Sequence, residues 1–336
     1  MALRVAVDVG HYAVKGFAGM SVTFPALVAS APATVDLGPL AGHDPRVTVC
    51  EDGESPAAYW IGEDAVHLAA PVWTRDKADD PRSRALLYAA FHRVGLANGP
   101  VAVAVGLPLS WYARHHAALS DSLLGRRVSV EVGGETHRWT ITVVRVLPQG
   151  VAAALTAIRQ GLLREPGLYA VVDIGYRTVD VVVMEVDRSG HPHGRPQWST
   201  TLDLGYHVVD DAVVRGLRSE HPGAEFLPAQ VQRERVTVFG QSVDLGRWRT
   251  PALLALAQRV TTAVQMNLGD VWAQLQGVVL VGGGGAALQS VLAWEGLPVF
   301  VPHEPALANV LGYWETIQHL AVPDSVVTPS RIIGTG

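Results

Sequence analysis

The most informative pattern of apolar and polar positions lies at residues 169–184, which read YAVVDIGYRTVDVVVM. An apolar run stops at Asp173, a turn opens at Gly175, and a second apolar run begins after Asp180. Short apolar runs bounded by turn residues are typical of buried strands. The stretch therefore predicts a strand, a tight turn and a return strand, with a carboxylate at the turn.

A second copy of this arrangement lies near the N-terminus. The run Val5–Val7 ends at Asp8, Gly10 opens the turn, and residues 15–19 form the return strand. Two copies about half a chain apart predict an internally duplicated fold. Glycine lets backbone N–H groups approach an anion closely, because no Cβ atom blocks the approach. A carboxylate beside that anion suits a hydrated Mg²⁺ that the phosphates also bind, so the two turns predict a split phosphate clamp.

Helical and strand patterns alternate along the rest of the chain. The expected helices span 82–94, 111–124, 151–163, 208–217, 253–272 and 305–320, and the expected further strands include 101–105, 127–132, 139–146, 278–281 and 299–301. A hairpin around Gly240 is also expected.

Composition narrows the class of protein. The 336 residues are too many for one ordinary core, so two domains are expected. A hydrophobic content of 49% with 17% charged residues is typical of a well-buried globular protein. The formal net charge of −5 offers no basic surface for direct nucleic-acid binding.

Targeting signals and cysteine usage point to the cytoplasm. The single cysteine, Cys50, supports neither a disulfide framework nor a cysteine metal site. The first strand begins too early to leave room for a signal peptide, and no apolar run reaches the roughly 18 residues that span a membrane. We therefore expect a cytoplasmic protein with no membrane partner.

Three further features suit a nucleotide. Lys15 is either a solvated strand residue or a point charge for the β- and γ-phosphates. Gln149 precedes a predicted helix, where it either faces a cleft or is a solvated loop residue. The strand at 278–281 ends in four glycines, 282–285, against which a base or phosphate can lie on bare backbone. No Lys-Ser or Lys-Thr follows these glycines, so the motif is not a P-loop.

Together these motifs resemble the actin, Hsp70 and sugar-kinase superfamily of ATPases. Within it the chain most resembles the bacterial and archaeal actin-like proteins, in particular the ParM/StbA type that segregates plasmids. The resemblance covers essentially the whole chain. It is carried by the first phosphate motif at 8–16, the second at 173–180, the adenosine motif at 281–288, the connecting helices at 149–150 and 306–312, and the signatures Phe24-Pro25, 60–65 and 105–108.

The resemblance implies a duplicated actin-like (ribonuclease H-like) α/β fold of two domains that face a nucleotide cleft. Domain I would span 1–163, with an inserted subdomain at about 28–68. Domain II would span 164–304, with an inserted subdomain at about 207–270. Residues 305–336 would form a C-terminal helix that returns to domain I.

The resemblance also implies hydrolysis of a nucleoside triphosphate, ATP or GTP, with Mg²⁺. Asp8 and Asp173 would hold the metal through water, and Gln149 would orient the attacking water. His11-Tyr12-Ala13 departs from the small or hydroxyl residues usual in the family, so phosphate donors there would be backbone N–H groups. The residues implied for nucleotide binding are Gly10, His11, Tyr12, Lys15, Gly175, Tyr176, Arg177, Thr178, Asp203, Gly205, Gly282, Gly283, Gly284 and Leu288.

The implied function is a cytomotive ATPase that assembles head to tail with itself and moves plasmid DNA through a DNA-binding adaptor protein. One alternative is a small-molecule kinase of the same superfamily. A kinase usually has a catalytic aspartate in the first domain, and between Val101 and Gln149 the only aspartate is Asp121, on a predicted surface helix. Another alternative is a non-filamentous adaptor of the PilM or FtsA type. The segment after Leu320 contains two prolines and is not an amphipathic membrane helix.

Overall fold

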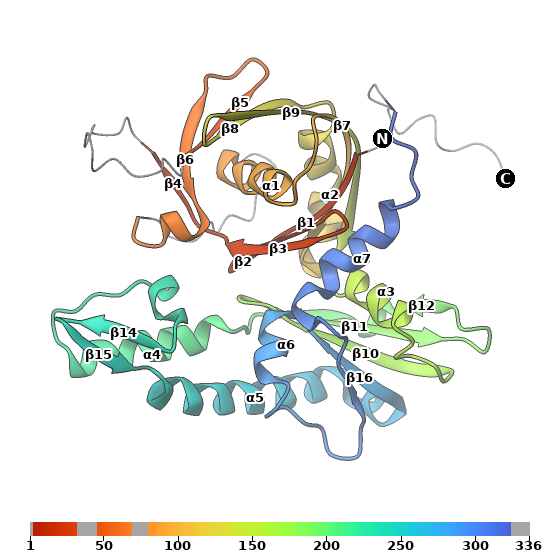
Figure 1. Cartoon of the computed structure of the whole chain (residues 1–336). Helices are drawn as coiled ribbons and strands as arrows, with labels where there is room; N and C mark the ends of the chain where they lie inside the picture. The colour runs from red at the N-terminus through yellow and green to blue at the C-terminus, as the bar shows by residue number, and fades with distance from the viewer. Residues whose placement is uncertain (1–2, 32–45, 69–79, 324–336) are drawn as a thin grey trace. The chain divides into compact units, whose positions relative to one another are not determined.

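The computed structural model of the chain describes residues 3–31, 46–68 and 80–323 (Figure 1). The chain divides into two compact units. Unit 1 comprises Met1–Leu107, Trp111–Leu147 and Tyr313–Gly336, and unit 2 comprises Pro108–Ser110 and Pro148–Gly312. Parts of the expected first subdomain (32–45) and most of the segment after Leu320 lie outside the described residues.

Unit 1 is built on a nine-stranded sheet with the strand order β3-β2-β1-β7-β9-β8-β5-β6-β4. Strand β1 pairs antiparallel with β2 and parallel with β7. The elements are β1 Leu3–Val9, β2 Ala13–Phe17, β3 Ser21–Pro25, β4 Val28–Ser30, β5 Val47–Glu51, β6 Ala57–Ile61, the 3₁₀ turn η2 Gly62–Ala65, α1 Pro81–Arg93, β7 Gly99–Leu107, α2 Leu109–Leu123, β8 Arg127–Val132 and β9 Glu135–Pro148.

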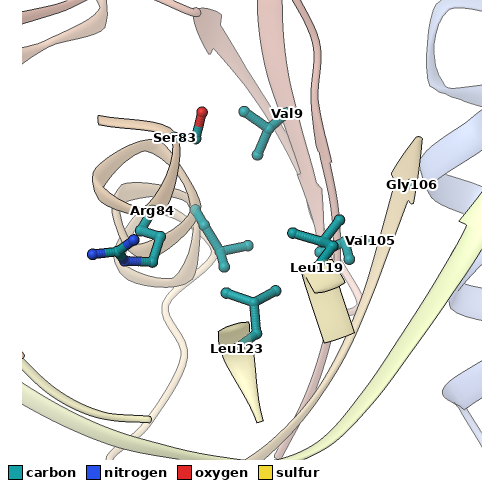
Figure 2. Close-up of a pocket in the computed structure, with 8 residues that line it drawn as sticks. Val9, Ser83, Arg84, Val105, Gly106, Leu119 and Leu123 are labelled. Carbon is teal, nitrogen blue, oxygen red and sulfur yellow. The ribbon is translucent and has the colours of Figure 1, made fainter. Parts of the chain in front are cut away.

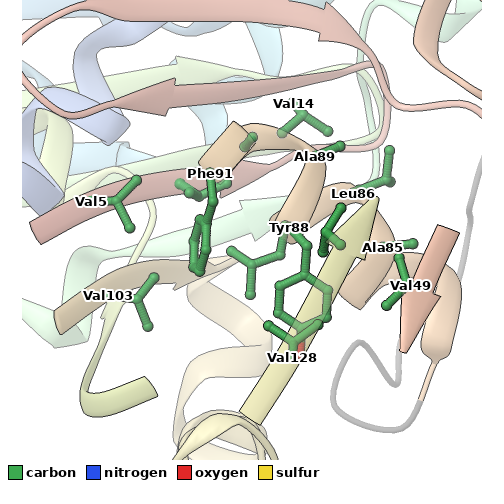
Figure 3. Packing of buried hydrophobic residues seen from close by; sticks show 14 of the residues in the cluster. Val5, Val14, Val49, Ala85, Leu86, Tyr88, Ala89, Phe91, Val103 and Val128 are labelled. Carbon is green, nitrogen blue, oxygen red and sulfur yellow. The ribbon is translucent and has the colours of Figure 1, made fainter. Parts of the chain in front are cut away.

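The sheet of unit 1 curves around helix α1, as Figure 1 shows. Residues 83–91 of α1 are all buried, and a helix that is buried all round requires a surrounding core. Figure 3 shows Phe91 and Tyr88 of α1 among valines from β1, β7 and β8. The predicted helix and its neighbouring strands thus form one core.

A cluster of mutually hydrogen-bonded polar side chains allows an arginine of α1 to be buried in this core. The Arg84 guanidinium donates to Glu51 on β5 at 2.8–3.0 Å. The Tyr88 hydroxyl and Arg126 donate to the same carboxylate. Burial alone would raise the pKa of Glu51, but these donors hold it below its usual value. A fully paired cluster of this kind fixes the orientation of the buried helix.

Unit 2 repeats the strand pattern of unit 1 around β10. Strand β10 pairs antiparallel with β11 and parallel with β16, in a six-stranded sheet of order β12-β11-β10-β16-β17, with β13 beside β11. The elements are α3 Val151–Arg159, β10 Gly167–Ile174, β11 Val179–Val186, β12 Pro192–Gly194, η3 Pro196–Trp198, β13 Thr200–Leu202, α4 His207–Glu220, η4 Pro228–Gln232, β14 Arg235–Val238, β15 Gln241–Asp244, α5 Gly246–Leu268, η5 Gly269–Gln274, β16 Leu275–Val281, α6 Gly282–Leu288, β17 Val299–Phe300, η6 Pro305–Leu307 and the start of α7 Ala308–Ile317, whose residues from Tyr313 onward belong to unit 1.

Alternate residues of β10 serve two cores on opposite faces of this sheet. Ala170 and Val172 pack with α5, whereas Tyr169 and Val171 pack with α3 and the start of α7. The strand is apolar on both faces, as expected for a strand covered by helices on each side. The expected hairpin around Gly240 is present as β14 and β15.

The boundaries of units 1 and 2 differ from the domain boundaries expected from the sequence at α3 and η6. Both lie in unit 2, whereas the boundaries placed α3 in domain I and residues 305–312 with the returning helix. The physical reason is that the alanines of α3 pack against β10 and β11. Thr156 of α3 also donates a hydrogen bond to the Ala308 carbonyl at 2.7 Å.

Candidate functional site

The first turn of the candidate site joins β1 to β2. The Gly10 N–H donates to the Ala13 carbonyl at 3.1 Å, which closes the turn. A Cβ atom on Gly10 would lie 2.7 Å from that carbonyl oxygen, so a side chain would disrupt the turn. The turn therefore needs glycine for its own geometry.

Asp8 and Lys15 face each other across this hairpin. Asp8 is buried, and its Oδ2 lies 3.3 Å from Lys15 Nζ. The Lys15 side chain is only 15% exposed, so it is not a solvated strand residue. The ammonium offsets the cost of burying the carboxylate.

His11 and Tyr12 replace the small or hydroxyl residues that are usual at these positions in the family, and the structure shows what they contact. The edge of the His11 ring meets Trp111 of α2, with ring centroids 5.8 Å apart. The Tyr12 carbonyl accepts a hydrogen bond from the Ala26 N–H at 2.9 Å. These contacts hold the tip of the first turn within unit 1.

The second turn joins β10 to β11 and repeats the closing hydrogen bond of the first. The Gly175 N–H donates to the Thr178 carbonyl at 2.9 Å. Asp173 faces Asp180 in register, seven positions later, as Asp8 faces Lys15 in unit 1. The two hairpins thus match in register as well as in sequence, as an internal duplication predicts.

The loop at 203–207 supports the second turn. A Cβ atom on Gly205 would lie 2.4 Å from the Tyr176 carbonyl oxygen and 2.6 Å from the Arg177 carbonyl carbon. The His207 backbone N–H donates to the Tyr176 carbonyl at 2.9 Å. Tyr176 is buried, and Asp203 is exposed at the start of the loop.

Asn309 joins Asp173 to the turn that follows Gln149. The Asn309 amide donates to Asp173 Oδ2 at 2.6 Å and accepts from the Gly150 N–H at 2.9 Å. Sequence reasoning did not select Asn309, although an amide within the apolar run of α7 was a usable signal. Gln149 itself is half-buried, one residue before Gly150.

Helix α6, Gly282–Leu288, includes the whole glycine run, although Gly282 itself has a φ of +86°. A Cβ on Gly282 would lie 2.3 Å from Asp173 Oδ1, and a Cβ on Gly284 would lie 2.5 Å from Ile174 Cγ2. Gly283 has open space around its Cβ position. Leu288 is fully buried in the core of unit 2. Gly283 is thus the position of this set where bare backbone meets solvent.

A second carboxylate, Asp180, lies across the hairpin from Asp173. Burial raises the pKa of Asp180 to about 7, and the Asp173 charge acts in the same direction. Hydrogen bonds from the Thr201 hydroxyl and the Leu109 N–H oppose that shift. Burial and the neighbouring Asp173 charge thus both favour the protonated form of Asp180.

The Asp8 and Asp173 carboxylates each suit a metal ion whose other ligands are mostly not protein groups. Asp8 and Asp173 supply hard oxygen donors, which Mg²⁺ prefers. Among the described residues, no group of three or more His, Cys, Asp or Glu side chains could hold a metal ion. Each turn by itself therefore offers one buried carboxylate, a kind of donor that suits a hydrated Mg²⁺ whose other ligands are water and phosphate oxygens.

A small cavity of unit 1 lies beside the first turn (Figure 2). Its volume is about 30 Å³, which has room for one or two water molecules and not for a nucleotide. Its lining consists of Val9, Ser83, Arg84, Leu87, Val105, Gly106, Leu119 and Leu123.

The fold class follows from comparison with solved structures. The structure of a ParM, described as the pCBH ParM non-polymerisable quadruple mutant, matches with a TM-score of 0.81 at 20% identity, over 95% of this chain and 100% of that one. The archaeal actin homolog Ta0583 matches with a TM-score of 0.77 at 23% identity, over 95% and 100%. A 15-stranded ParM filament from Clostridium botulinum matches with a TM-score of 0.80 at 19% identity, over 95% and 100%. The fold is the actin-like two-domain α/β fold, which confirms the predicted fold class.

The family follows from sequence. The model "Actin like proteins N terminal domain" matches residues 6–151, and "Archaeal actin homologue MreB-like, C-terminal" matches residues 171–293. The chain belongs to the actin-like proteins, as its motifs predicted. Archaeal actin homologs of Thermoplasma volcanium and Thermoplasma acidophilum are 32% and 33% identical to it over 107 residues. That match spans 30% of this chain and only 33% of either relative. No helix within the described part of the chain is both long and apolar enough to cross a membrane.

Proposed function

We propose that this chain is a nucleoside triphosphatase that assembles into filaments when it binds a triphosphate. The observation that carries the proposal is the pair of matched hairpins, each with a buried aspartate before a glycine turn closed by the same hydrogen bond. Relatives with this fold support it: Ta0583 has been crystallised with ADP, and the Clostridium botulinum ParM forms a filament.

The chain's own residues would divide the chemistry as follows. Backbone N–H groups of the two turns and the Lys15 ammonium would bind phosphate oxygens. Asp8 and Asp173 would hold the water shell of Mg²⁺, and when bound the metal would neutralise phosphate charge. Gln149 would orient the attacking water, because positioning supplies most of the catalysis in phosphoryl transfer. Gly283 would offer bare backbone to the nucleoside.

Assembly would follow from differential binding. A triphosphate that contacts both turns favours the arrangement of the units in which both contact it, since a ligand shifts an equilibrium only toward the state it binds better. A fixed protomer with unlike end surfaces repeats head to tail into an open helix.

We further propose that these filaments segregate plasmids in the cytoplasm through a DNA-binding adaptor protein. The net charge of −5 disfavours direct contact with DNA. Purified filaments should therefore fail to sediment DNA unless the adaptor is added. Co-sedimentation of DNA with the filament alone would argue against this division of labour.

Light scattering and sedimentation test the main proposal. Both should rise when ATP or GTP is added with Mg²⁺ and fall as phosphate is released, and the nucleotide that gives the larger response identifies the preferred base. Protein that stays monomeric at tens of micromolar, roughly the scale of moderate interfaces, contradicts the filament proposal. Phosphorylation of an added sugar or acid under those conditions would favour the kinase alternative.

A further inference from the structure

Asn309 is a buried amide whose two polar ends are both bonded. It lies on α7 and is 5% exposed. Its Nδ2 donates to Asp173 Oδ2 on β10 at 2.6 Å, and its Oδ1 accepts from the Gly150 N–H, at the start of α3, at 2.9 Å. The two bonds join segments that are 136 and 159 residues away from Asn309 in sequence.

The orientation of this amide is determined by its partners. An ionised carboxylate only accepts hydrogen bonds, and a backbone N–H only donates. The Nδ2 group must therefore face Asp173, and Oδ1 must face Gly150. Aspartate would keep the acceptor and lose the donor, and leucine would lose both.

The backbone around Asn309 and Gly150 is closely packed. Gly150 has a φ of +77°, and a Cβ there would lie 2.8 Å from Val182 Cγ2. A Cβ on Gly312, one turn after Asn309, would lie 1.9 Å from the Ala152 carbonyl oxygen. Helices α3 and α7 thus cross with backbone in direct contact, which fixes how far the Asn309 side chain reaches.

We propose that Asn309 is a positioning residue that sets Gln149 relative to Asp173. The inference rests on the proposed function, in which Gln149 orients water and Asp173 anchors the metal's water shell. In this role Asn309 would touch neither the nucleotide nor the reacting water. It acts through the Asp173 carboxylate and through the turn that carries Gln149. A misplacement of about 1 Å costs roughly 100-fold in rate when catalysis depends on positioning, so this link is expected to control kcat.

Three variants distinguish the effect of losing the two Asn309 hydrogen bonds from the effect of a general loss of packing between α3 and α7. Asn309→Leu removes both bonds at similar volume, and Asn309→Asp keeps the acceptor for Gly150 but places a second carboxyl group against Asp173 in place of the amide donor. Thr156→Val is the matched control, because it removes the buried hydrogen bond from α3 to the Ala308 carbonyl, next to Asn309, and leaves Asp173 untouched. Phosphate release with ATP and Mg²⁺ gives kcat and KM, thermal unfolding gives Tm, and hydrogen exchange of the nucleotide-free protein reports on the Gly150 amide.

We expect kcat to fall at least about tenfold in both Asn309 variants, with KM for ATP changed less than about threefold. Exchange at Gly150 should accelerate in Asn309→Leu and stay slow in Asn309→Asp. Thr156→Val should keep kcat within about twofold while losing a similar amount of Tm. Normal kcat in both Asn309 variants, or an equal loss of kcat in Thr156→Val, overturns the inference.

The exchange measurement separates this inference from the proposed function. A wild-type protein that hydrolyses no nucleotide overturns the proposed function. In that case the hydrogen-exchange rate of the Gly150 amide still tests whether Asn309 fixes the turn that carries Gln149. Equal exchange rates in wild type and Asn309→Leu would show that it does not.

Discussion

The Lys15 ammonium lies 3.3 Å from the Asp8 carboxylate, on the strand that returns from the first turn. Lys15 therefore already has an anionic partner before any phosphate binds. A triphosphate with its metal would share this ammonium with Asp8, so we expect the pair to link the phosphates to the carboxylate that we propose holds the metal through water. An ammonium held in this way is pre-oriented, which lowers the entropy cost of ligand binding.

Lys15→Met tests this link by removing the charge and keeping the length of the side chain. We expect triphosphate affinity to fall roughly 10- to 100-fold, because a hydrogen bond to a charged group contributes about 1.5–3 kcal/mol. Titration calorimetry at fixed salt measures the change. The control is Arg127→Met, which removes a positive charge from an exposed position of the same unit. Equal affinities for Lys15→Met and Arg127→Met would show that Lys15 does not contact phosphate.

Asp173→Ala should abolish Mg²⁺-dependent hydrolysis. The metal would lose an anchor beside the phosphates, and Asn309 would lose its acceptor, at a cost of about 1–3 kcal/mol in stability. Phosphate release and thermal unfolding measure the two effects. Asp121→Ala is the control, because Asp121 is exposed on α2. Activity that survives in Asp173→Ala and disappears in Asp121→Ala would support a kinase.

Gln149→Ala should bind nucleotide almost normally and hydrolyse it more slowly, by about 10- to 100-fold. The reason is that Gln149 lies beside Gly150, whose N–H is held by Asn309. After a fixed pulse of ATP, filaments of this variant should persist longer than wild-type filaments in light scattering. Disassembly on the wild-type time course would remove Gln149 from the mechanism.

Local chemistry explains why the two turns could be predicted from sequence. An apolar run, an aspartate and a glycine determine a strand and its turn within a few residues, and both hairpins are present as β1–β2 and β10–β11. Resemblance to a known family then supplied the arrangement of elements that periodicity alone does not give. The role of each site residue remains a prediction.

Long-range packing explains what the sequence did not show. The partners of Asn309 lie more than 130 residues away, so no local pattern could identify them. A run of glycines is by intrinsic propensity a poor helix former. The run at 282–285 is helical because Gly282 and Gly284 fit against Asp173 and Ile174, where any Cβ atom would clash. Tertiary contact here outweighs intrinsic propensity.

Asp210 makes the stability of unit 2 dependent on pH. It is fully buried on α4, and neither carboxylate oxygen has a hydrogen-bond partner of normal geometry in the structure. Burial raises its pKa to about 7, against the opposing effect of the Tyr176 and Gln232 side chains. Between about pH 4 and pH 7 the native state keeps a proton that the unfolded chain has lost, so the free energy of unfolding falls as pH rises.

Asp210→Asn should remove this dependence in part. The measured quantity is the free energy of unfolding of the variant minus that of wild type. We expect this difference to be roughly 2–3 kcal/mol larger at pH 8 than at pH 5, because the amide needs no proton. Asp180, with a pKa also raised to about 7, contributes in the same direction and remains in the variant. Urea unfolding at both pH values measures the difference. Asp211→Asn removes a charge from the next, half-exposed position, and an identical change there would assign the effect to net charge and not to burial.

Phe239 combines two unfavourable features at the tip of the β14–β15 hairpin. Its side chain is 80% exposed, and its φ is +46°. Gly240 follows with a φ of +82°, so both residues of this two-residue turn occupy the left-handed region. Such turns match the twist of the flanking strands, and Asn-Gly is their preferred sequence. A bulky residue in this conformation costs about 1–2 kcal/mol, whereas asparagine tolerates it.

Phe239→Asn should therefore stabilise unit 2 by about 0.5–1 kcal/mol and raise its Tm by about 1–3 °C. The register between Val238 and Gln241 should stay unchanged, since the turn keeps its length. Phe239→Ala is the matched control: it removes the exposed ring but keeps a Cβ residue without the local hydrogen bonds that favour asparagine. Calorimetry should show a gain for asparagine and little gain for alanine. Equal gains in both variants would assign the cost to the exposed ring, and a loss in both would mean that the ring packs on a surface that the hairpin needs.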